Sequence, residues 1–199
     1  MSKKVTTQQI ISLIQERAEN SQYFVVAISG FGGSGKSTLA KIFSESLKDS
    51  IVISLDSFIL NNLNTRSSNW NNFDWSRLIN EVLDPIKKGK QKLKYGIYNW
   101  NENKVIDQKD VVVPKYIIVE GVGLLRDELK DYFDLSVWID IPLGVATQQG
   151  KRRDKEEYKV DNDKSWDEIW TPNDLAYYES YNPQSRADLL IKLNEIKRF

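Results

Sequence analysis

A glycine-rich turn between an apolar run and a helical pattern is the feature that most constrains this chain. Residues 30–37 read GFGGSGKS, which fits the pattern G-x-x-x-x-G-K-[ST]. Residues 23–28 before the turn are apolar and β-branched, as in a buried strand, and residues 37–47 after it carry apolar side chains at helical spacing. The sequence therefore predicts a strand, a tight turn and a helix in that order.

This turn predicts a binding site for the phosphates of a nucleotide. Glycines allow consecutive backbone N–H groups to converge on phosphate oxygens, and the N-terminus of the next helix adds unpaired N–H groups and the positive end of its dipole. Lys36 is expected to reach the β- and γ-phosphates, and the Ser37 hydroxyl to complete a Mg²⁺ shell. The residues expected to bind the nucleotide are Gly30, Gly32, Gly33, Ser34, Gly35, Lys36, Ser37 and Thr38.

Composition excludes several other kinds of site. The 199 residues include no cysteine and no histidine. Zinc sites built on these residues, disulfides and Ser-His or Cys-His dyads are therefore ruled out. A general base must then be a carboxylate, a lysine or a tyrosine. Lys plus Arg and Asp plus Glu number 28 each, so the net charge is zero. That balance does not support a nucleic-acid partner, which would call for a basic excess.

The same composition sets expectations for compartment and partners. Absence of cysteine fits a reducing cytosol. No apolar run approaches the roughly 18 residues needed to span a bilayer, and the N-terminus lacks the apolar core of a signal peptide. We therefore expect a cytoplasmic protein with no membrane partner. The sequence leaves a homo-oligomer open.

Strands alternate with helices along the chain, which predicts an α/β fold with a mostly parallel sheet covered by helices on both faces. The length suits a single domain over residues 1–199. Further strands are expected at 51–55, 116–121, 135–140 and 188–193, and helices at 6–19, 75–88, 124–131, 143–158 and 163–181. Residues 92–98 and 104–113 are expected to pair as a hairpin that projects from the sheet.

Three candidate site residues lie at the ends of predicted strands. Gly30 follows the first strand, Asp56 the second, and Glu120 ends the apolar run of the third. Ligands of open parallel sheets bind beyond the carboxyl ends of the strands, so these features should share one crevice. Asp56 could accept a proton from a substrate hydroxyl in line with the γ-phosphate, or it could cap a turn. Glu120 could act in the site or form an ion pair with Lys36.

Two classes of phosphate-loop protein lack support in the sequence. The guanine-specificity motif N-K-x-D is absent, which argues against a signalling-type GTPase. An L-S-G-G-Q stretch is also absent, which argues against an ABC-type transport ATPase. The carboxylate at Asp56 instead favours transfer of the γ-phosphoryl group to a substrate hydroxyl.

The chain resembles the uridine kinase-like family of P-loop small-molecule kinases, which is related to phosphoribulokinases and bacterial pantothenate kinases. The matching stretches run in family order and are residues 28–37, Leu55-Asp56-Ser57-Phe58, Phe73-Asp74-Trp75, Tyr98-Asn99-Trp100, Val119-Glu120-Gly121-Val122, Arg152-Arg153-Asp154 and Pro183-Gln184-Ser185-Arg186-Ala187-Asp188. The resemblance implies a P-loop NTPase fold with an acceptor-side insertion at about 58–113, which contains the hairpin, and a helical lid at about 144–160.

The resemblance also implies roles for individual residues, with ATP and Mg²⁺ as cofactors and a small-molecule acceptor as partner. Catalytic roles fall to Asp56 as base for the acceptor hydroxyl, to Lys36, and to Arg153, which would close over the transferring phosphoryl group with the lid. Glu120 would join Ser37 in the Mg²⁺ shell or position the acceptor. The implied acceptor-binding residues, including an aromatic wall at Tyr98 and Trp100, are Asp56, Phe58, Tyr98, Trp100 and Glu120. The implied acceptor is a nucleoside such as uridine or cytidine.

Departures from the family pattern leave the acceptor open. Gln149 and Gly150 stand where a second lid arginine is usual, with Lys151 or Arg152 as possible substitutes, and Asn103 stands where a histidine is usual. The acceptor could therefore be another hydroxyl metabolite, namely a pantothenate-like acid, a sugar phosphate or a nicotinamide nucleoside. A third hypothesis is a nucleotide-binding regulatory protein without efficient transfer.

Several residues also have structural alternatives. Tyr98 and Trp100 could be core aromatics, and residues 151–153 could be a solvated helix face. The helical spacing of Trp166 and Trp170 favours packing. The polar, Asn-rich residues 61–72 predict either a long loop or a flap on the substrate side.

Overall fold

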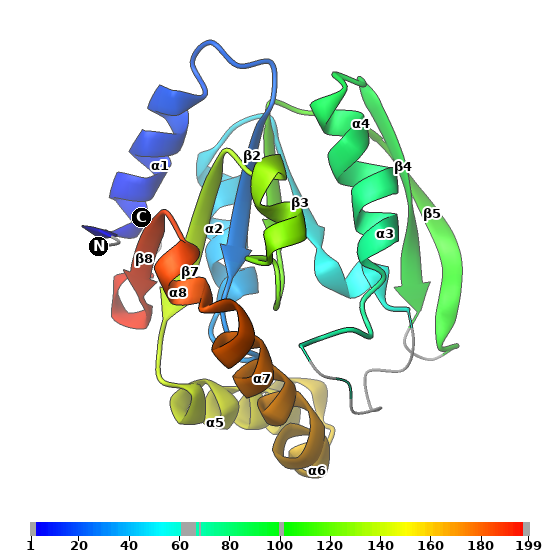
Figure 1. Cartoon of the computed structure of the whole chain (residues 1–199), viewed down its shortest axis with the longest axis vertical. Coiled ribbons are helices and arrows are strands. Elements are labelled where there is room, and N and C mark those ends of the chain that lie inside the picture. The colour runs from blue at the N-terminus through cyan, green and yellow to red at the C-terminus, as the bar shows by residue number, and fades with distance from the viewer. Residues whose placement is uncertain (1–2, 61–66, 68, 100–101, 197–199) are drawn as a thin grey trace.

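A parallel sheet forms the centre of the computed structural model, which describes residues 3–60, 67, 69–99 and 102–196 (Figure 1). Within these residues, six strands pair in the order β1-β8-β7-β2-β6-β3, and every pairing is parallel. The predicted α/β fold is thus confirmed. The strands are β1 (Lys3–Lys4), β2 (Phe24–Ser29), β3 (Ser50–Ser54), β6 (Tyr116–Glu120), β7 (Leu135–Asp140) and β8 (Leu189–Lys192).

Three of the four inner strands, β2, β6 and β7, supply the centre of the core. All six residues of β2 are buried, as are four of the five in β6 and five of the six in β7. Parallel strands with both faces covered read as continuous apolar runs, which is the pattern that predicted them. Each fully buried aliphatic or phenylalanine side chain contributes about 1.5–3 kcal/mol, so these strands anchor everything attached to their ends.

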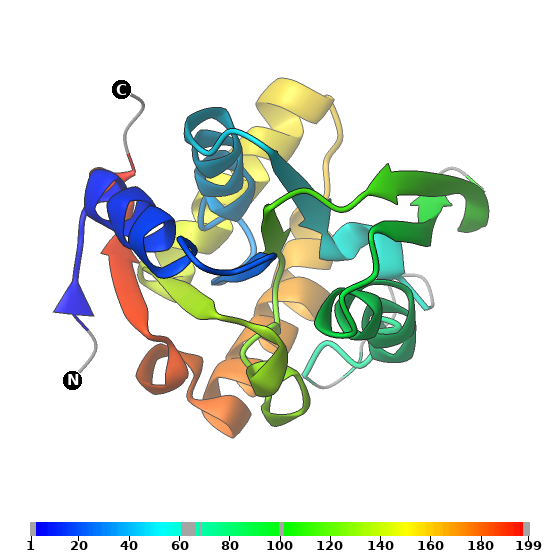
Figure 2. The ribbon, with the colours of Figure 1, turned by 90° about the horizontal axis from the view of Figure 1, so that it is seen from above.

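Helices cover both faces of the sheet (Figure 2). α1 (Thr7–Arg17) and α2 (Lys36–Ser46) lie on one face. The 3₁₀ helix Asp127–Tyr132 and α8 (Pro183–Arg186) lie on the other. This 3₁₀ helix replaces the helix predicted over residues 124–131, because the backbone at Arg126 is extended and the helical turns begin only after it.

The N-terminus of α1 carries a capping box. Thr6 Oγ1 accepts a hydrogen bond from the Gln9 backbone N–H at 3.3 Å, and Gln9 Oε1 accepts one from the Thr6 N–H at 2.9 Å. Two N–H groups that the helix itself cannot satisfy are thereby paired. The cap fixes the start of the helix, and Ile10, Ile11 and Ile14 then point into the core.

The predicted hairpin forms a second, two-stranded sheet beside the main one (Figure 1). β4 (Lys92–Asn99) pairs antiparallel with β5 (Lys104–Val112). A continuous helix made of α3 (Trp75–Arg77), a π-helical turn (Leu78–Leu83) and α4 (Asp84–Lys87) lies against it. Arg77 Nη2 donates to the Gly96 carbonyl at 2.9 Å and so ties this helix to β4.

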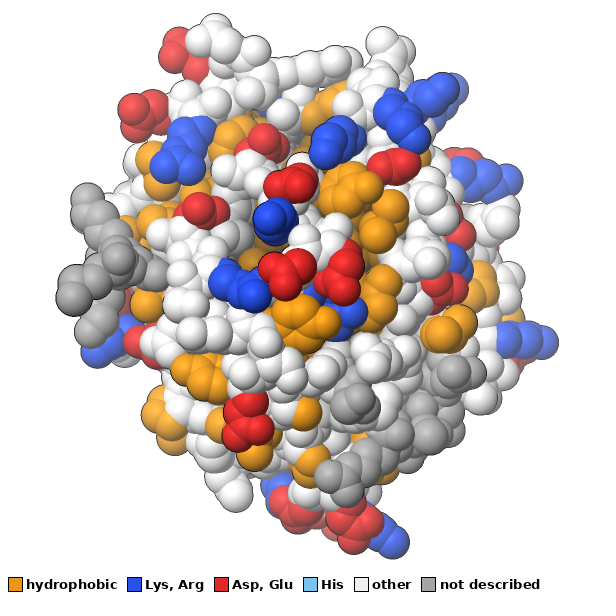
Figure 3. Space-filling view, viewed as in Figure 1, with side chains coloured by type: hydrophobic (Ala, Val, Ile, Leu, Met, Phe, Trp, Pro, Cys, Tyr) orange, Lys and Arg blue, Asp and Glu red, His pale blue; other side chains and the backbone are white. Residues whose placement is uncertain are grey.

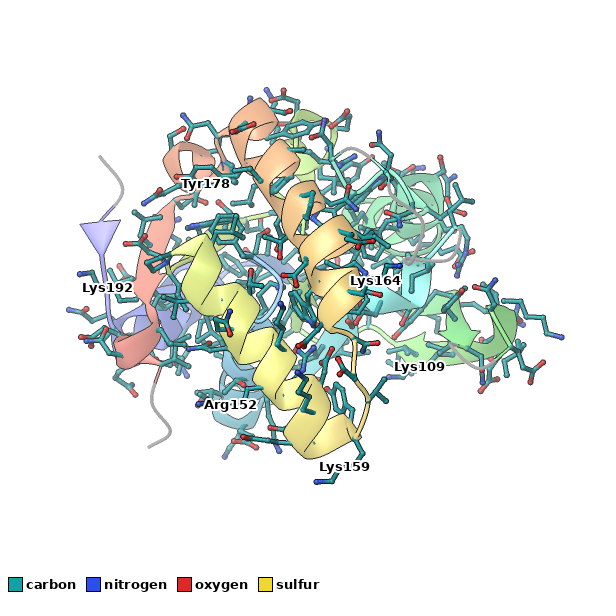
Figure 4. All side chains as sticks on the ribbon, turned by 90° about the horizontal axis from the view of Figure 1, so that it is seen from below. Lys109, Arg152, Lys159, Lys164, Tyr178 and Lys192 are labelled. Atoms are coloured by element: carbon teal, nitrogen blue, oxygen red, sulfur yellow. The ribbon has the colours of Figure 1, made fainter. Side chains whose placement is uncertain are left out.

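Two helical segments cross beneath the carboxyl ends of the strands (Figure 4). The first is α5 (Leu143–Arg153), which continues through a π-helical turn to Tyr158 and ends at Lys159, the residue that marks the far end of this segment in Figure 4. The second consists of α6 (Asp163–Ser165), a π-helical turn (Trp166–Trp170) and α7 (Thr171–Tyr181). Together they lie over the edge of the sheet where the predicted site residues gather.

The surface carries mixed charge. On the face shown in Figure 3, lysine and arginine side chains alternate with aspartate and glutamate, without a broad patch of one sign. Among the helices in the described ranges, none is long and apolar enough to cross a membrane. Much of the Asn-rich segment lies outside the described residues, as does Trp100.

Candidate active site

The candidate site lies where β2, β3 and β6 end. In the register of the sheet, Glu120 pairs with Ile28 on one side and with Ser54 on the other, so the three strands end at one level. The glycine-rich turn follows β2 directly, and the turn that contains Asp56 follows β3. Because the strands are parallel, the predicted features emerge on the same edge, facing the helices α5 to α7 (Figure 1).

The turn after β2, here called the phosphate loop (residues 30–35), needs glycine for two separate reasons. Gly33 and Gly35 have φ angles of 77° and 97°, in the left-handed region that other residues rarely adopt. At Gly33 an added Cβ would also lie 2.2 Å from the carbonyl oxygen of Ala146, because the backbone of α5 packs directly on the loop. The next helix, α2, begins at Lys36 with no side-chain cap, which leaves its first N–H groups for a ligand.

Lys36 and Glu120 are both buried at the base of the site. Lys36 Nζ donates to the Phe31 carbonyl at 2.8 Å and does not form the ion pair with Glu120 that was one alternative. Burial lowers the pKa of Lys36, and the nearby carboxylates, Glu120 foremost, oppose that shift. The lysine is therefore held by a neutral carbonyl oxygen, beside carboxylates that favour its charged form.

Ser37 and Glu120 offer a fitting pair of ligands for Mg²⁺. Ser37 Oγ donates to Glu120 Oε2 at 3.3 Å, so two oxygen ligands from α2 and β6 already lie side by side. Mg²⁺ binds oxygen and is usually held by one or two protein groups together with substrate phosphates. The side chains fit that requirement, and a nucleotide bound at the phosphate loop beside them would supply the phosphates.

Asp56 faces the cavity from the 3₁₀ turn Leu55–Phe58. The cap of this turn is Ser54, whose hydroxyl accepts the Asp56 N–H at 3.3 Å, so the carboxylate of Asp56 is not the capping group. The side chain is accessible from the cavity, yet crowding by protein atoms keeps much of the water away. This desolvation, with the negative charge of Glu120, raises the pKa of Asp56 to about 6. Lys36 and Arg153 partly oppose the rise. A carboxylate with that pKa is well matched to accept a proton near neutral pH.

Arg153 is the last residue of α5 and is held by its neighbour. Its Nη2 and Nε donate to Asp154 Oδ1 at 2.8 and 3.2 Å, and its guanidinium lies 5.1 Å from the centre of the Tyr158 ring. Asp154 is buried and also accepts hydrogen bonds from Asn162 and Trp166. Burial alone would raise the pKa of Asp154, but these hydrogen bonds outweigh it and hold the pKa below its usual value. The arginine is thus fixed by a charged, fully bonded carboxylate.

These groups line one cavity of about 590 Å³. Of the predicted site residues it brings together Gly32, Gly33, Lys36, Ser37, Asp56, Glu120 and Arg153. A second cavity of about 490 Å³ shares Gly33, Lys36, Ser37 and Arg153 and adds Gly35 and Thr38. The two cavities meet at the phosphate loop.

Other predicted residues lie outside both cavities. Ser34 is buried in the loop, and Gly30 supports it from behind, where an added Cβ would lie 2.6 Å from Ser34 Oγ. Phe58 is fully buried and stacks on Tyr95 with ring centres 5.8 Å apart. Tyr98 is also buried, with its hydroxyl on Asn103. Trp100 falls outside the described residues. The acceptor-binding roles of Phe58, Tyr98 and Trp100 therefore stay predictions.

The aromatic wall of the larger cavity comes from residues that the sequence analysis did not assign to the site. Its aromatic members are Trp70, Phe73, Tyr158, Trp166 and Trp170. Trp166 and Trp170 do pack on each other, edge to face at 5.0 Å, as their spacing indicated, but they also face the cavity. Helical spacing shows that two residues share a face, whereas it cannot show what that face meets.

Asp174 was also not predicted as a site residue from the sequence. It is buried in α7, where it accepts hydrogen bonds from the Gly32 backbone and from the Trp70 indole. Burial raises the pKa of Asp174 to about 6, against the influence of Lys36 and of both hydrogen bonds. Nothing in the residues around position 174 indicates that a carboxylate there lies beneath the phosphate loop.

The substitutes for the second lid arginine have other partners. An added Cβ at Gly150 would lie 2.3 Å from the Trp166 ring, so a larger residue does not fit there in this arrangement. Lys151 pairs with Asp167 at 2.6 Å. Arg152 has an exposed side chain, 3.9 Å from Glu156, and borders the second cavity. Figure 4 shows Arg152 on the outer side of α5.

Comparison with known proteins identifies the family of this chain. A model of the phosphoribulokinase/uridine kinase family matches residues 60–195. A curated uridine kinase from Shewanella piezotolerans is 32% identical over 154 residues, covering 69% of this chain and 72% of that protein. A second, from Pasteurella multocida, is 31% identical over 149 residues, covering 67% of this chain and 68% of that protein.

The fold is likewise shared with a solved structure described as a possible uridine kinase from Bacillus stearothermophilus. It superposes with a TM-score of 0.70 at 20% identity, covering 92% of this chain and 98% of that one. At that identity the likeness shows the fold alone, and the family follows from the family model and the curated relatives. This chain belongs to the phosphoribulokinase/uridine kinase family of P-loop kinases.

Proposed function

We propose that this protein transfers the γ-phosphoryl group of ATP, with Mg²⁺, to a hydroxyl group of a nucleoside of the uridine or cytidine type. The observation that carries the proposal is the shared cavity, in which the Asp56 carboxylate and Arg153 face the loop that bears Lys36. The curated relatives named as uridine kinases support the choice of acceptor.

The proposed reaction begins with the acceptor hydroxyl beside Asp56. Its oxygen forms a bond to the γ-phosphorus while the bond to the β–γ bridging oxygen breaks, and the hydroxyl proton passes to the Asp56 carboxylate. The products are ADP and a phosphate monoester. Lys36, Arg153 and the loop N–H groups counter the negative charge that spreads over the transferred group. Mg²⁺, when bound beside Ser37 and Glu120, supplies further positive charge against the phosphate oxygens.

Water is the competing acceptor in any such reaction, so the site must exclude it. Trp166 and Tyr158, with Val160, lie on the lid side of the cavity and cover it with apolar surface. A closed apolar cover also strengthens the electrostatic contacts inside. Transfer to a bound alcohol is then favoured over hydrolysis.

A second candidate is a kinase for another hydroxyl metabolite, namely a pantothenate-like acid, a sugar phosphate or a nicotinamide nucleoside. What supports it is the acceptor side itself. Tyr98 and Asn103 bond to each other, and neither lines the cavity, while Trp70, Phe73 and Trp170 do. An acceptor held by a different set of aromatic residues need not be uridine.

A panel of acceptors tests the proposal. The protein is incubated with ATP, Mg²⁺ and each compound in turn, ADP release is followed by a coupled assay, and the product is identified by mass spectrometry. We expect uridine or cytidine to give the highest rate and a monophosphate product. A higher rate with one of the other compounds moves the function to that acceptor. ATP binding without acceptor-stimulated ADP release across the panel would favour a regulatory protein instead.

A further inference from the structure

Asp174 joins two parts of the cavity that are far apart in the sequence. Its Oδ2 accepts the backbone N–H of Gly32 at 2.6 Å, and its Oδ1 accepts the indole N–H of Trp70 at 2.9 Å. The residue is only 1% exposed. Burying a carboxylate is costly unless hydrogen bonds replace its water, and here each oxygen receives one. The position of the carboxylate is therefore set by both donors at once.

Trp70 is held in a backbone conformation that it would not choose by itself. Asn69 and Trp70 have φ angles of 56° and 59°, in the left-handed region. Asparagine tolerates this region, but for a bulky residue it is an outlier that surrounding contacts must maintain. The contacts that hold it include the bond from the Trp70 indole to Asp174, the bond from Arg126 Nη2 to the Asn69 carbonyl at 2.8 Å, and the bond from the Phe73 N–H to the Trp70 carbonyl at 3.3 Å. Loss of the Asp174 contact would let the turn relax and withdraw Trp70 from the cavity.

The other end of the link lies in the phosphate loop. Gly32 lines the same cavity as Trp70 and is followed by the residues whose N–H groups lead into α2. The phosphate loop precedes α2, so the helix does not hold the backbone at Gly32, and contacts from other segments help to fix it. Trp166 packs beside Gly32, where an added Cβ would lie 2.9 Å from its ring, and Asp174 supplies the hydrogen bond.

We propose that Asp174 is a positioning residue that clamps the phosphate loop to the acceptor side of the cavity, so that nucleotide binding at the loop is transmitted to Trp70. The inference rests on the proposed function, because it takes the loop as the nucleotide side and the Trp70 wall as the acceptor side. If Gly32 moves and the Asp174 carboxylate moves with it, the hydrogen bond between Asp174 and Trp70 must change as well. A displacement of Gly32 is thus felt at Trp70 through one side chain.

Two variants separate the arms of this clamp. Asp174→Asn keeps the shape of the side chain, but one of the two oxygen positions becomes a donor NH₂ group, so either the Gly32 N–H or the Trp70 indole N–H loses its acceptor. Trp70→Phe removes the indole donor together with part of the ring, and it leaves the bond between Asp174 and Gly32 in place. Glu179→Gln is the matched control, because Glu179 is an exposed carboxylate on the same helix.

Nuclear magnetic resonance of ¹⁵N-labelled protein gives a direct readout, with the Trp70 indole signal assigned by its absence in Trp70→Phe. In the protein without ligand, Asp174→Asn should speed exchange of the Trp70 indole proton or of the Gly32 amide proton, whichever loses its acceptor, about tenfold, the size expected for losing one hydrogen bond to a charged group. Addition of Mg²⁺ and adenylyl imidodiphosphate to the wild type should shift the Gly32 amide and the Trp70 indole along one titration curve. In Asp174→Asn the loop amides should still respond while the indole does not.

Trp70→Phe serves if Asp174→Asn does not fold. Its reporters are the backbone amides of Phe73 and Asp74, which donate to Trp70 and Phe58 carbonyls. They should respond to nucleotide in the wild type and in Glu179→Gln but not in Trp70→Phe. A purely structural role for Asp174 would change exchange rates without changing this response.

Each contrary result has a definite meaning. An indole response in Asp174→Asn equal to that of the wild type would overturn the clamp, as would a wild-type indole that ignores nucleotide while the loop amides shift. If adenylyl imidodiphosphate shifts no loop amide in the wild type, the proposed function fails. The exchange rates without ligand still test the clamp in that case, because unchanged rates for both the Gly32 amide and the Trp70 indole in Asp174→Asn would contradict it.

Discussion

The proposed phosphate side and the proposed acceptor side of the cavity are built in opposite ways. The phosphate side is one continuous segment, residues 30–38, and it acts mainly through its backbone. The acceptor side is assembled from side chains of distant segments, namely Trp70, Phe73, Tyr158, Trp166 and Trp170. A site made of backbone depends on where glycine is allowed, which is a local property of the sequence. A site made of side chains depends on how distant segments pack together, and that is not a local property of the sequence.

Asp56 lies where the two sides meet, and its loss should have the largest effect. Asp56→Asn keeps the size of the side chain but removes the base, so we expect kcat to fall by roughly 10²–10⁴-fold. Binding of adenylyl imidodiphosphate, measured by calorimetry, should be retained because the phosphate loop is untouched. Asp110→Asn, an exposed carboxylate on β5, is the control and should leave both values unchanged. Normal turnover by Asp56→Asn would show that another group takes the proton.

The next largest effect tests whether the phosphate side depends on backbone shape. Gly33→Ala introduces a Cβ at a φ of 77° and 2.2 Å from the Ala146 carbonyl, so either the loop or α5 must move. A displacement of this kind commonly costs about 10²-fold, and we expect a loss of that size in kcat/KM. Gly144→Ala is the matched control, since no atom lies within 4 Å of a Cβ added there. Equal activity of the two variants would mean that the loop tolerates a side chain and that the close approach of α5 is not required.

The pH dependence of the reaction gives the third test, also centred on Asp56. Its raised pKa of about 6 means that the carboxylate is protonated, and inactive as a base, below that pH. We expect kcat/KM for the acceptor to be level above pH 6 and to fall about tenfold per pH unit below it. A pH profile of the wild type, repeated with Asp56→Asn, checks this, and the inflection near pH 6 should be absent from the variant.

Unfolding through the same group would not imitate this profile. A carboxyl whose folded-state pKa lies above its value of 3.8 in the unfolded chain binds protons more readily when folded. Lowering the pH from 6 towards 3.8 therefore favours the folded state as far as Asp56 is concerned, and the same holds for Asp174. Melting temperatures across this range should not fall in step with activity, and a parallel fall would reassign the inflection to unfolding.

The sequence was sufficient for most of the fold. The strands β2, β3, β6, β7 and β8 lie within a residue or two of their predicted bounds, because buried parallel strands are continuous apolar runs. The hairpin was also predicted, since its two extended segments are close in the chain. The 3₁₀ helix Asp127–Tyr132 was predicted as a helix that begins three residues earlier, at residue 124, because apolar spacing does not distinguish a 3₁₀ helix from an α-helix.

The acceptor side was not accessible in the same way. Asp174 lies 104 residues from Trp70 in the sequence, and it becomes buried only because the fold packs these two segments together. Trp166 and Trp170 have the spacing of packed residues, and they are packed, yet one side of the pair faces the cavity. Asp154 stood next to a predicted lid arginine, but its role in holding Arg153 depends on Asn162 and Trp166 approaching from the next segment.

The smallest expected effect decides between two acceptor walls, one implied by the family resemblance and one seen in the cavity. Trp170 faces the cavity and is half-buried, whereas Tyr98 is buried elsewhere with its hydroxyl on Asn103. Aromatic contacts are worth about 0.5–1.5 kcal/mol, so Trp170→Leu should raise the KM of the acceptor by about twofold to tenfold. Its kcat should change little, because a contact to the ring of the acceptor serves the ground state and the transition state alike.

Tyr98→Leu is the matched variant on the hairpin. Removal of this buried ring should lower the melting temperature while leaving the KM of the acceptor unchanged, because the acceptor in the cavity would not touch it. Steady-state kinetics with the best acceptor of the panel, together with melting curves, separates the two variants. The reverse pattern, a raised KM for Tyr98→Leu and an unchanged one for Trp170→Leu, would move the acceptor towards the hairpin. The wall would then be the one that the resemblance implies, and Trp166 and Trp170 would serve only to exclude water.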